Sequence, residues 1–372
     1  RGRESAATPS AADMRFLHVI TDFTSPYGAE TALARLLRHG GVEGDVVSLR
    51  GISAANRRAA GPCPRRYHAL GARGPCGFMR AVGALAALLR RDRPDRVVCW
   101  MYHAMVAGAL ATRMAGTGAP VFWMVRQSLD DPAALTRSTR AALAAARQLS
   151  PSATGICYNA HRARALHRAY GFSDRNDAVV ANGFDLPSQP EVGSTARVFG
   201  VASRYHPQKD YPTLLAAAAH ACAARPDIRF VMSGDGAEAG NPSFVDCLRR
   251  SGAPRDRISL LGECADMGPF YRGIDALVLS SRTEGCPNVV GEAMSYAKPV
   301  VTTDVGDAAR IVGATGLVAP PRDPHALARA IVAMRDLDPE AYAERARAAR
   351  LRIEEIGTVP AMVAHLSDFM RV

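Results

Sequence analysis

The chain has 372 residues, of which 48% are hydrophobic and 22% are charged. This length allows two or three domains, and this composition is that of a globular protein, so wholesale disorder is excluded. The sequence contains no run of about 18 apolar residues without a charge, which argues against a membrane-spanning protein. The eight cysteines are scattered and form no CxxC pair, so we expect reduced thiols in a cytosolic protein, with neither a metal knuckle nor a disulfide framework.

The net charge of +11 lies entirely in the first half of the chain. Residues 1–190 contain 25 Arg, no Lys and 13 acidic residues, whereas residues 191–372 contain 21 basic and 22 acidic residues. This asymmetry suits an anionic partner, whether phosphate, nucleic acid or an anionic membrane surface. A compositional bias towards Arg explains the use of Arg in place of Lys, but it leaves the scarcity of acids in one half unexplained.

The chain begins with 13 small and polar residues, which we interpret as a disordered leader before Met14. In the rest of the first half, short apolar runs alternate with helical patterns, and the segment 51–77 looks like a loop. The predicted strands are 15–20, 45–49, 96–101, 120–125, 155–158 and 178–181, and the predicted helices are 30–39, 78–91, 105–115, 132–148 and 161–170.

A linker over residues 187–195 separates this half from a second half with the same alternation. Strands alternating with helices predict parallel sheets covered by helices on both faces, so the fold class is α/β with two similar domains, 14–186 and 196–356. The second half has predicted strands at 197–202, 228–232, 257–261, 276–280 and 299–302, and predicted helices at 211–224, 242–252, 266–273, 288–297 and 323–337.

Polar and glycine residues follow the predicted strands, at the sheet edge where open α/β sheets bind ligands. Arg204 and Lys209 are two cations that suit a diphosphate, although a solvated surface pair is the alternative. His103 is equally compatible with a structural core histidine, and the glycines around Gly234 with a plain turn. The other residues of this kind are Gly28, Tyr102, Arg126, Ser128, Gly262 and Glu263.

The segment from Glu284 to Glu292 is the strongest candidate for ligand binding. Pro287 suits the first turn of a helix, and the free N–H groups of that turn would form an anion site. We expect Glu284 just outside this helix and Glu292 two turns inside it. Helix capping alone would explain Glu284, but it gives no reason for Glu292 in an Ala/Met-rich helix.

At these residues the sequence resembles the retaining GT-B glycosyltransferases of family 4, over nearly the whole chain from Met14. The resemblance implies the GT-B fold, with an N-terminal acceptor domain, a C-terminal nucleotide-sugar domain, and a final helix within 357–372 that returns to the first domain. It implies that Arg204 and Lys209 bind the donor diphosphate, that Glu284 binds the donor sugar, and that Glu292 binds the ribose. Further donor contacts implied are Gly28, Gly262, Glu263, Cys286, Pro287, Asn288 and Val289, and Tyr102 falls on the acceptor side. From their places after predicted strands, we assign Gly234 to the donor and Arg126 and Ser128 to the acceptor side.

The function implied by the resemblance is transfer of a sugar, with retention, from a UDP-sugar to a glycan or lipid-linked acceptor in cell-surface polysaccharide biosynthesis. No protein nucleophile, metal or other cofactor is implied, and His103 would orient the donor sugar. Three positions depart from the family pattern. The loop at Gly28 has one glycine where relatives often have two, Cys286 stands where an aromatic residue is common, and Asp210 replaces the usual glycine after the lysine.

A nucleotide-sugar epimerase or hydrolase of the same fold is the main alternative. A nucleic-acid partner is not expected, because the basic half has few aromatic residues and no recognised nucleic-acid motif. An anionic membrane surface and a soluble acceptor remain equally compatible with the basic half. The candidate membrane contacts are Arg57, Arg58, Arg65, Arg66, Arg73 and Arg80, with Phe78, Met79 and Val82 as candidates for shallow insertion.

Overall fold

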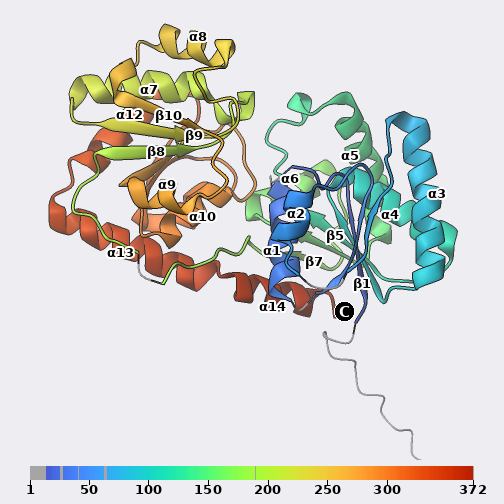
Figure 1. Ribbon diagram of the computed structural model, residues 1–372. Helices are drawn as coiled ribbons and strands as arrows, with labels where there is room; N and C mark the ends of the chain where they lie inside the picture. The colour runs from blue at the N-terminus through green and yellow to red at the C-terminus, as the bar shows by residue number, and fades with distance from the viewer. Residues whose placement is uncertain (1–13, 26–27, 41, 63–64, 189, 372) are drawn as a thin grey trace, which may run out of the picture. The chain divides into compact units, whose positions relative to one another are not determined.

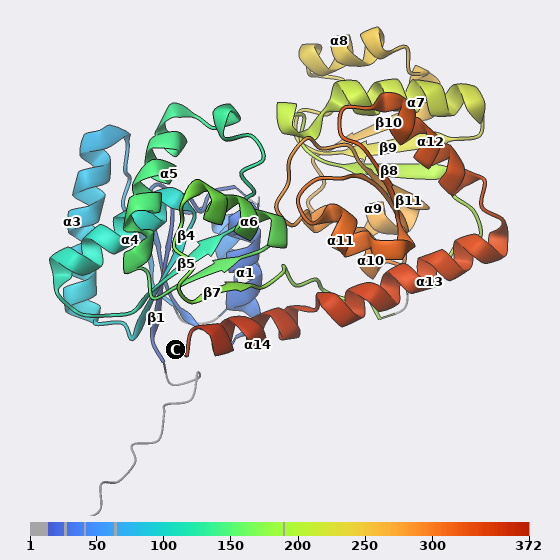
Figure 2. The same ribbon diagram turned by 180° about the vertical axis from the view of Figure 1, so that it is seen from behind.

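The computed structural model describes residues 14–25, 28–40, 42–62, 65–188 and 190–371. The chain folds into two compact units, each a parallel sheet with helices on both faces (Figures 1 and 2). Unit 1 contains the chain up to Gly183 together with the residues from Val359 onward, and unit 2 contains Phe184–Thr358. The expected leader, 1–13, and Tyr27 beside Gly28 lie outside the described residues.

Unit 1 is built on a seven-stranded parallel sheet with the order β3-β2-β1-β4-β5-β6-β7. Its central strands are rich in Val, Ile, Phe and Trp and are buried on both faces, as expected for a parallel sheet covered by helices. The strands are β1 Phe16–Ile20, β2 Gly44–Ser48, β3 Tyr67–Ala69, β4 Arg96–Trp100, β5 Val121–Val125, β6 Gly155–Tyr158 and β7 Asp177–Val179.

Alternate residues of these strands pack into two cores on opposite faces of the sheet. One core joins Val97, Cys99 and Trp123 to the helices α3, α4, α5 and α6, and the other joins Val98 and Phe122 to α1 and the C-terminal helix α14. The helices of unit 1 are α1 Gly28–His39, α2 Ala54–Ala59, α3 Gly74–Asp92, α4 Tyr102–Ala115, α5 Arg137–Leu149, α6 His161–Tyr170 and α14 Val359–Phe369.

Unit 2 is built on a six-stranded parallel sheet with the order β10-β9-β8-β11-β12-β13. Helices α7, α8 and α12 cover one face, and α9, α10 and α11 cover the other (Figures 1 and 2). The strands are β8 Val198–Ala202, β9 Arg229–Ser233, β10 Ile258–Gly262, β11 Ala276–Leu279, β12 Val300–Thr303 and β13 Leu317–Ala319. The helices are α7 Tyr211–Ala224, α8 Pro242–Ser251, α9 Gly268–Gly273, α10 Asn288–Ser295, α11 Ala308–Val312, α12 Pro324–Arg335 and α13 Pro339–Ile356.

The segment 51–77 is not simply a loop, which corrects the sequence prediction. It contains α2, whose N-cap Ser53 accepts a hydrogen bond from the backbone N–H of Asn56 at 3.1 Å, then β3, and then the first residues of α3. Strand β3 is only three residues long and its hydrogen-bonded neighbour in the sheet is β2, so tertiary pairing decides its structure. Helix α11 and the short edge strand β13 were also not predicted.

The basic segment of unit 1 is only partly available for a membrane contact. Arg65 donates hydrogen bonds to the backbone carbonyls of Ala60 and Leu37, and Arg66 forms an ion pair with Asp45 at 2.6 Å. Val82 is completely buried and therefore cannot insert into a bilayer. The burial of Val82 corrects its expected insertion, Arg65 is held by backbone carbonyls, and Arg66 stays exposed beside its partner. No helix in the part of the chain that the structure describes is long and apolar enough to cross a membrane.

Candidate active site

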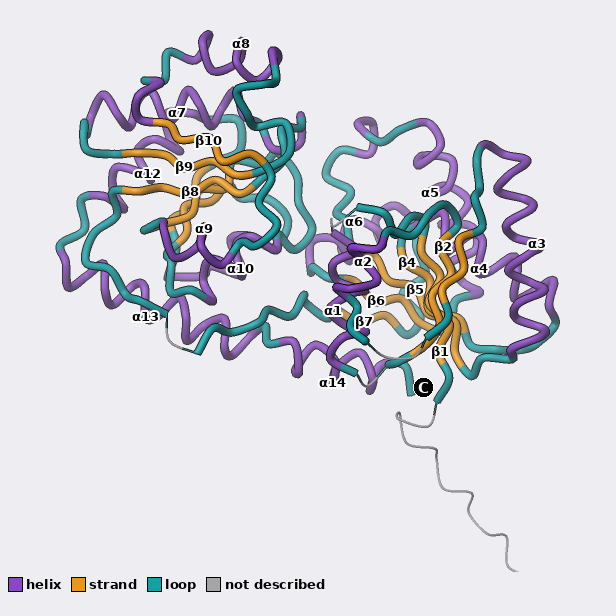
Figure 3. The backbone as a smooth tube through the Cα atoms, in the orientation of Figure 1, coloured by secondary structure: helices purple, strands orange, loops and turns teal. Residues whose placement is uncertain are grey.

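Two loops of unit 2 meet at the edge of the sheet where its parallel strands end (Figure 3). The loop after β8 carries Lys209, and the loop after β11 carries Glu284. The Ser280 hydroxyl donates a hydrogen bond to the Lys209 carbonyl at 2.7 Å, and the Gln208 side-chain amide donates to the Thr283 carbonyl at 2.7 Å. These bonds fix the relative position of two segments about 75 residues apart in sequence.

Lys209 and Glu284 form an ion pair, with 2.5 Å between Lys209 Nζ and Glu284 Oε1. Only 19% of the lysine side chain and 10% of the glutamate side chain are exposed, so the pair is largely withdrawn from water. The Ser281 hydroxyl donates to the same carboxylate oxygen at 2.6 Å. The resemblance implied that Lys209 binds the donor diphosphate and Glu284 the donor sugar. The structure shows that the two side chains also form an ion pair with each other.

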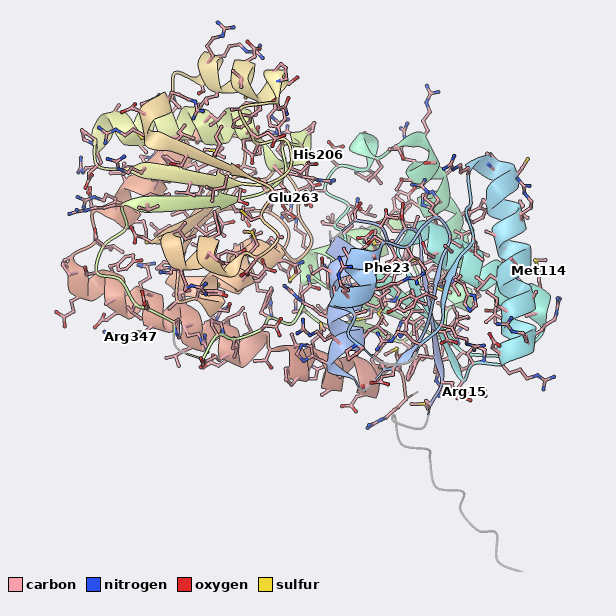
Figure 4. All side chains as sticks on the ribbon, viewed as in Figure 1. Arg15, Phe23, Met114, His206, Glu263 and Arg347 are labelled. Atoms are coloured by element: carbon pink, nitrogen blue, oxygen red, sulfur yellow. The ribbon has the colours of Figure 1, made fainter. Side chains whose placement is uncertain are left out.

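Arg204 adds positive charge to the loop that carries Lys209, and His206 lies between them in the sequence. Burial lowers the pKa of His206, and the charges of Arg204 and Lys209 lower it further, which favours the neutral imidazole. The positive charge that suits an anionic ligand therefore comes from Arg204 and Lys209. Sequence reasoning missed His206, although its position between Arg204 and Lys209 was a usable signal. Figure 4 shows His206 and the exposed Glu263 at the same edge of unit 2.

Two glycines allow close backbone contacts with the loops that carry Lys209 and Glu284. Gly234 lies after β9, and Gly306 lies after β12. A Cβ on Gly234 would lie 2.1 Å from the Ser203 carbonyl oxygen, and a Cβ on Gly306 would lie 2.2 Å from that of Gly285. Any side chain would push the loops apart, because real Cβ atoms do not approach backbone this closely. Gly234 was predicted as a site residue, whereas Gly306 was missed because a single glycine after a strand is a common turn signal.

Helix α10 begins at Asn288, with Pro287 at its N-cap and no side chain capping it. Cys286 is buried, while Asn288 and Val289 are half-buried. Glu292 lies just over one turn inside the helix, not two turns as expected. The Tyr271 hydroxyl donates to Glu292 Oε2 at 2.7 Å and thereby orients this carboxylate. The sequence showed no sign that Tyr271, which lies on α9, would reach α10.

Tyr102 lies in the core of unit 1, which corrects its assignment to the acceptor side. It is 1% exposed, and its hydroxyl forms a 2.8 Å hydrogen bond with His167 Nε2. The first turn of α4 places this side chain against His167 of α6, in the core of unit 1. Its neighbour His103 is half-buried, and burial followed by the charge of Arg50 lowers the pKa of His103.

Arg126, Ser128 and Asn159 lie just beyond the ends of β5 and β6 and are buried. The Arg126 guanidinium lies over the Trp100 ring at 5.1 Å and donates to Asn182 Oδ1 at 3.3 Å. Within the described residues, neither Ser128 Oγ nor Asn159 Oδ1 has a hydrogen-bond partner, so both can still bond to a ligand or water. Asn159 was not predicted. Gly28 is the first residue of α1, with φ of +42° and open space where a Cβ would be.

Among the described residues, no group of three or more His, Cys, Asp and Glu is arranged to hold a metal ion. The groups that could hold an anion are instead the basic side chains around Lys209 and the backbone at the start of α10.

The architecture of two parallel α/β units, with polar residues at their strand ends, is the GT-B fold, which confirms the predicted fold class. Residues 31–187 match the family model Glycosyltransferase Family 4, and residues 196–336 match the model Glycosyl transferases group 1. The two matches lie in units 1 and 2 respectively, apart from the last few residues of the first. Both units are therefore glycosyltransferase domains.

Similar proteins include a lipopolysaccharide core biosynthesis mannosyltransferase, LpcC, of Rhizobium leguminosarum bv. viciae. It is 30% identical over 180 residues, which are 44% of this chain and 51% of LpcC, so the match spans about half the length of this curated relative. HepE of Anabaena, solved in complex with UDP-glucose, is 21% identical, with a TM-score of 0.81 over 96% of this chain and 99% of HepE. The lipopolysaccharide outer core galactosyltransferase WaaB is 17% identical, with a TM-score of 0.71 over 96% of this chain and 100% of WaaB.

Proposed function

We propose that the protein transfers a sugar from a UDP-sugar to a glycan or lipid-linked acceptor, with retention of the anomeric configuration. The observation that carries this proposal is the Lys209–Glu284 pair, with the positive charge of Arg204 on the same loop of unit 2. A diphosphate supplies the anion that Lys209 would bind, and a sugar hydroxyl can donate to Glu284. HepE binds UDP-glucose and LpcC acts in lipopolysaccharide synthesis, which supports a nucleotide-sugar donor and a cell-surface polysaccharide pathway.

The chemistry follows from the charges at this edge. Cleavage of the donor leaves negative charge on the departing diphosphate, which Lys209, Arg204 and the first N–H groups of α10 would stabilise. Glu284 would hold a hydroxyl of the donor sugar, and Glu292, oriented by Tyr271, would hold the ribose. The acceptor hydroxyl attacks from the side that the diphosphate leaves: its oxygen bonds to the anomeric carbon as the bond to the diphosphate breaks, and its proton passes to the departing diphosphate. No protein nucleophile therefore takes part, and the configuration is retained.

The first test is ligand selectivity. Thermal-shift measurements against nucleoside diphosphates and nucleotide sugars should show selective stabilisation by UDP and one UDP-sugar, because a ligand that binds only the native state raises its stability. Glu292→Ala and Lys209→Ala should nearly abolish transfer without unfolding the protein. A folded Glu292→Ala variant with full activity contradicts the site. Release of free sugar or an epimerised donor without an acceptor would instead favour a hydrolase or epimerase.

Metal independence is a separate prediction. If protein cations neutralise the leaving diphosphate, transfer should continue unchanged in excess EDTA. The measurement is the initial rate of UDP release with EDTA against the rate with added Mg²⁺ or Mn²⁺. A strict requirement for either ion contradicts the proposed role of Lys209 and Arg204.

We assign acceptor recognition to the strand ends of unit 1. His103 would orient the reacting sugar, and Ser128 and Asn159 offer buried hydrogen-bonding atoms to acceptor hydroxyls. We also propose that unit 1 contacts the anionic inner face of the plasma membrane. Residues 46–91 include nine Arg and no Asp or Glu. Met79 and Met114, on the adjacent helices α3 and α4, are 58% and 52% exposed.

A further inference from the structure

Asp210 adopts a backbone conformation that is uncommon for any residue other than glycine. It lies between Lys209 and the first residue of α7, with φ of 51° and ψ of 52°, in the left-handed region. Glycine adopts this conformation without steric cost, whereas other residues do so at a cost that Asp and Asn tolerate best. The turn itself is therefore satisfied by glycine, and the aspartate side chain must be explained by its contacts.

Both oxygens of the Asp210 carboxylate are engaged, and the residue is 0% exposed. Oδ2 accepts a hydrogen bond from the Thr213 hydroxyl at 2.8 Å, a local contact within the first turn of α7. Oδ1 accepts one from Arg282 Nη2 at 2.6 Å, across 72 residues of sequence. A buried carboxylate is costly unless it is paired in this way, so the Arg282 contact is the reason that the charge is tolerated.

This ion pair lies between the two functional loops. Asp210 directly follows Lys209, and Arg282 lies two residues before Glu284. The backbone N–H of Arg282 donates to the Gln208 carbonyl at 2.8 Å, so side-chain and backbone contacts join the same two loops. The Arg282 guanidinium is thus bonded to Asp210, and Lys209 is the cation bonded to Glu284.

We propose that Asp210 is a positioning residue: by clamping Arg282, its carboxylate sets Lys209 against the donor diphosphate. This inference rests on the proposed function, because it assumes that Lys209 binds the diphosphate. The clamp acts on the phosphate end of the donor through Lys209, and its loss should therefore affect phosphate recognition while leaving recognition of the nucleoside unchanged.

The test is the affinity of Asp210→Gly for UDP, UMP and uridine, measured by isothermal titration calorimetry. Glycine keeps the left-handed backbone without steric cost, so the protein should stay folded, with a modest fall in the thermal midpoint because Arg282 loses its counter-ion. UDP affinity should fall about tenfold, the order expected when a charged contact is displaced, while uridine affinity stays unchanged. Asp210→Asn keeps one hydrogen-bond acceptor for Arg282, so its UDP affinity should lie between those of the wild type and Asp210→Gly.

Two further variants separate positioning from general stability. Asp336→Asn removes an Arg–Asp pair of the same 2.6 Å length, formed with Arg225 at the other end of α7, and should leave all three affinities unchanged. Arg282→Gln should weaken UDP binding as Asp210→Gly does, and the double variant should be no worse than either single one, because both remove the same contact.

The outcomes that contradict the clamp differ from those that contradict the donor site. An equal loss of UDP and uridine affinity in Asp210→Gly would show a structural role and overturn the clamp. Unchanged UDP affinity in that variant, while Lys209→Ala binds UDP poorly, also overturns the clamp but leaves the donor site standing. UDP affinity that is insensitive to Lys209→Ala overturns the donor site and the clamp together.

Discussion

Lys209 and Glu284 show how stability and function can be separated at the scale of single residues. Removing one partner of a largely buried ion pair leaves the other charge without its counter-ion, so Lys209→Met should cost about 1–3 kcal/mol of unfolding free energy. Lys209→Met combined with Glu284→Gln removes both charges and should recover most of that loss, yet it should remain inactive. Urea unfolding and transfer assays of the same samples test this. Activity that returns with stability in the double variant would show that the pair has only a structural role.

Two buried histidines predict acid sensitivity of unit 1. Burial lowers the pKa of His18 and of His167 to about 4, from the ordinary value of 6.5. The unfolded chain therefore binds more protons than the native chain between these values, and the unfolding free energy falls as the pH drops from about 6.5 towards 4. Each histidine contributes about 3 kcal/mol over that range.

Tryptophan fluorescence measures this effect selectively, because both tryptophans of the chain, Trp100 and Trp123, lie in unit 1. The urea midpoint should fall between pH 7.5 and pH 5, and His167→Gln should reduce the fall. His365, which is exposed on α14, provides the matched control. The variant His365→Gln should show the same fall in the urea midpoint as the wild type. An equal midpoint at both pH values in the wild type would contradict the prediction.

At the scale of elements, α14 is the segment whose role the structure defines most clearly. Its buried residues Val359, Met362 and Leu366, with Met370 just after the helix, pack into the core that α1 and β1 share, and Phe369 meets Phe122 edge to face at 5.5 Å between ring centroids. The last helix of the chain is thus part of unit 1, separated in sequence from the rest of that unit by the whole of unit 2.

Deleting residues 358–372 should therefore destabilise unit 1 more than unit 2. Leu366→Ala alone should cost about 2–5 kcal/mol by leaving a cavity in this core. His365→Ala, next to it on the exposed side of α14, should cost little. The readouts are the tryptophan-detected urea transition and the proteolytic protection of residues 14–183. Unchanged protection after the deletion would mean that α14 does not support unit 1.

At the scale of the whole molecule, the charge asymmetry predicts binding to anionic vesicles. Arg65 and Arg66 already bond to other groups of unit 1. The exposed residues Arg57, Arg58, Arg73 and Arg80 are therefore the candidate lipid contacts, together with exposed Met79. Each basic residue near an anionic surface adds about 1 kcal/mol of attraction, which salt weakens. The protein should sediment with anionic vesicles at low ionic strength and be released as salt is added.

Changing these four arginines to Ser should weaken vesicle binding and leave UDP binding by unit 2 intact. The control replaces Arg249 and Arg250, which are exposed on α8 of unit 2, with Ser. It removes two positive charges, as replacing two of the four arginines would, and should leave vesicle binding unchanged. Equal binding to neutral and anionic vesicles, or none at low salt, would remove the membrane from the proposal and leave a soluble acceptor.

The sequence alone determined the α/β class of both halves and the loops at the strand ends that carry the candidate site, and its resemblance to family 4 implied the GT-B fold. These features depend on local information, because buried strands need apolar runs, helices need their own periodicity, and parallel strands all end at one edge. The tertiary structure decided which side chains meet. It alone paired Lys209 with Glu284, brought Tyr271 to Glu292, turned Tyr102 into the core and set Arg282 on Asp210. Each of these contacts joins residues far apart in the chain, and no local pattern records the partner that packing selects.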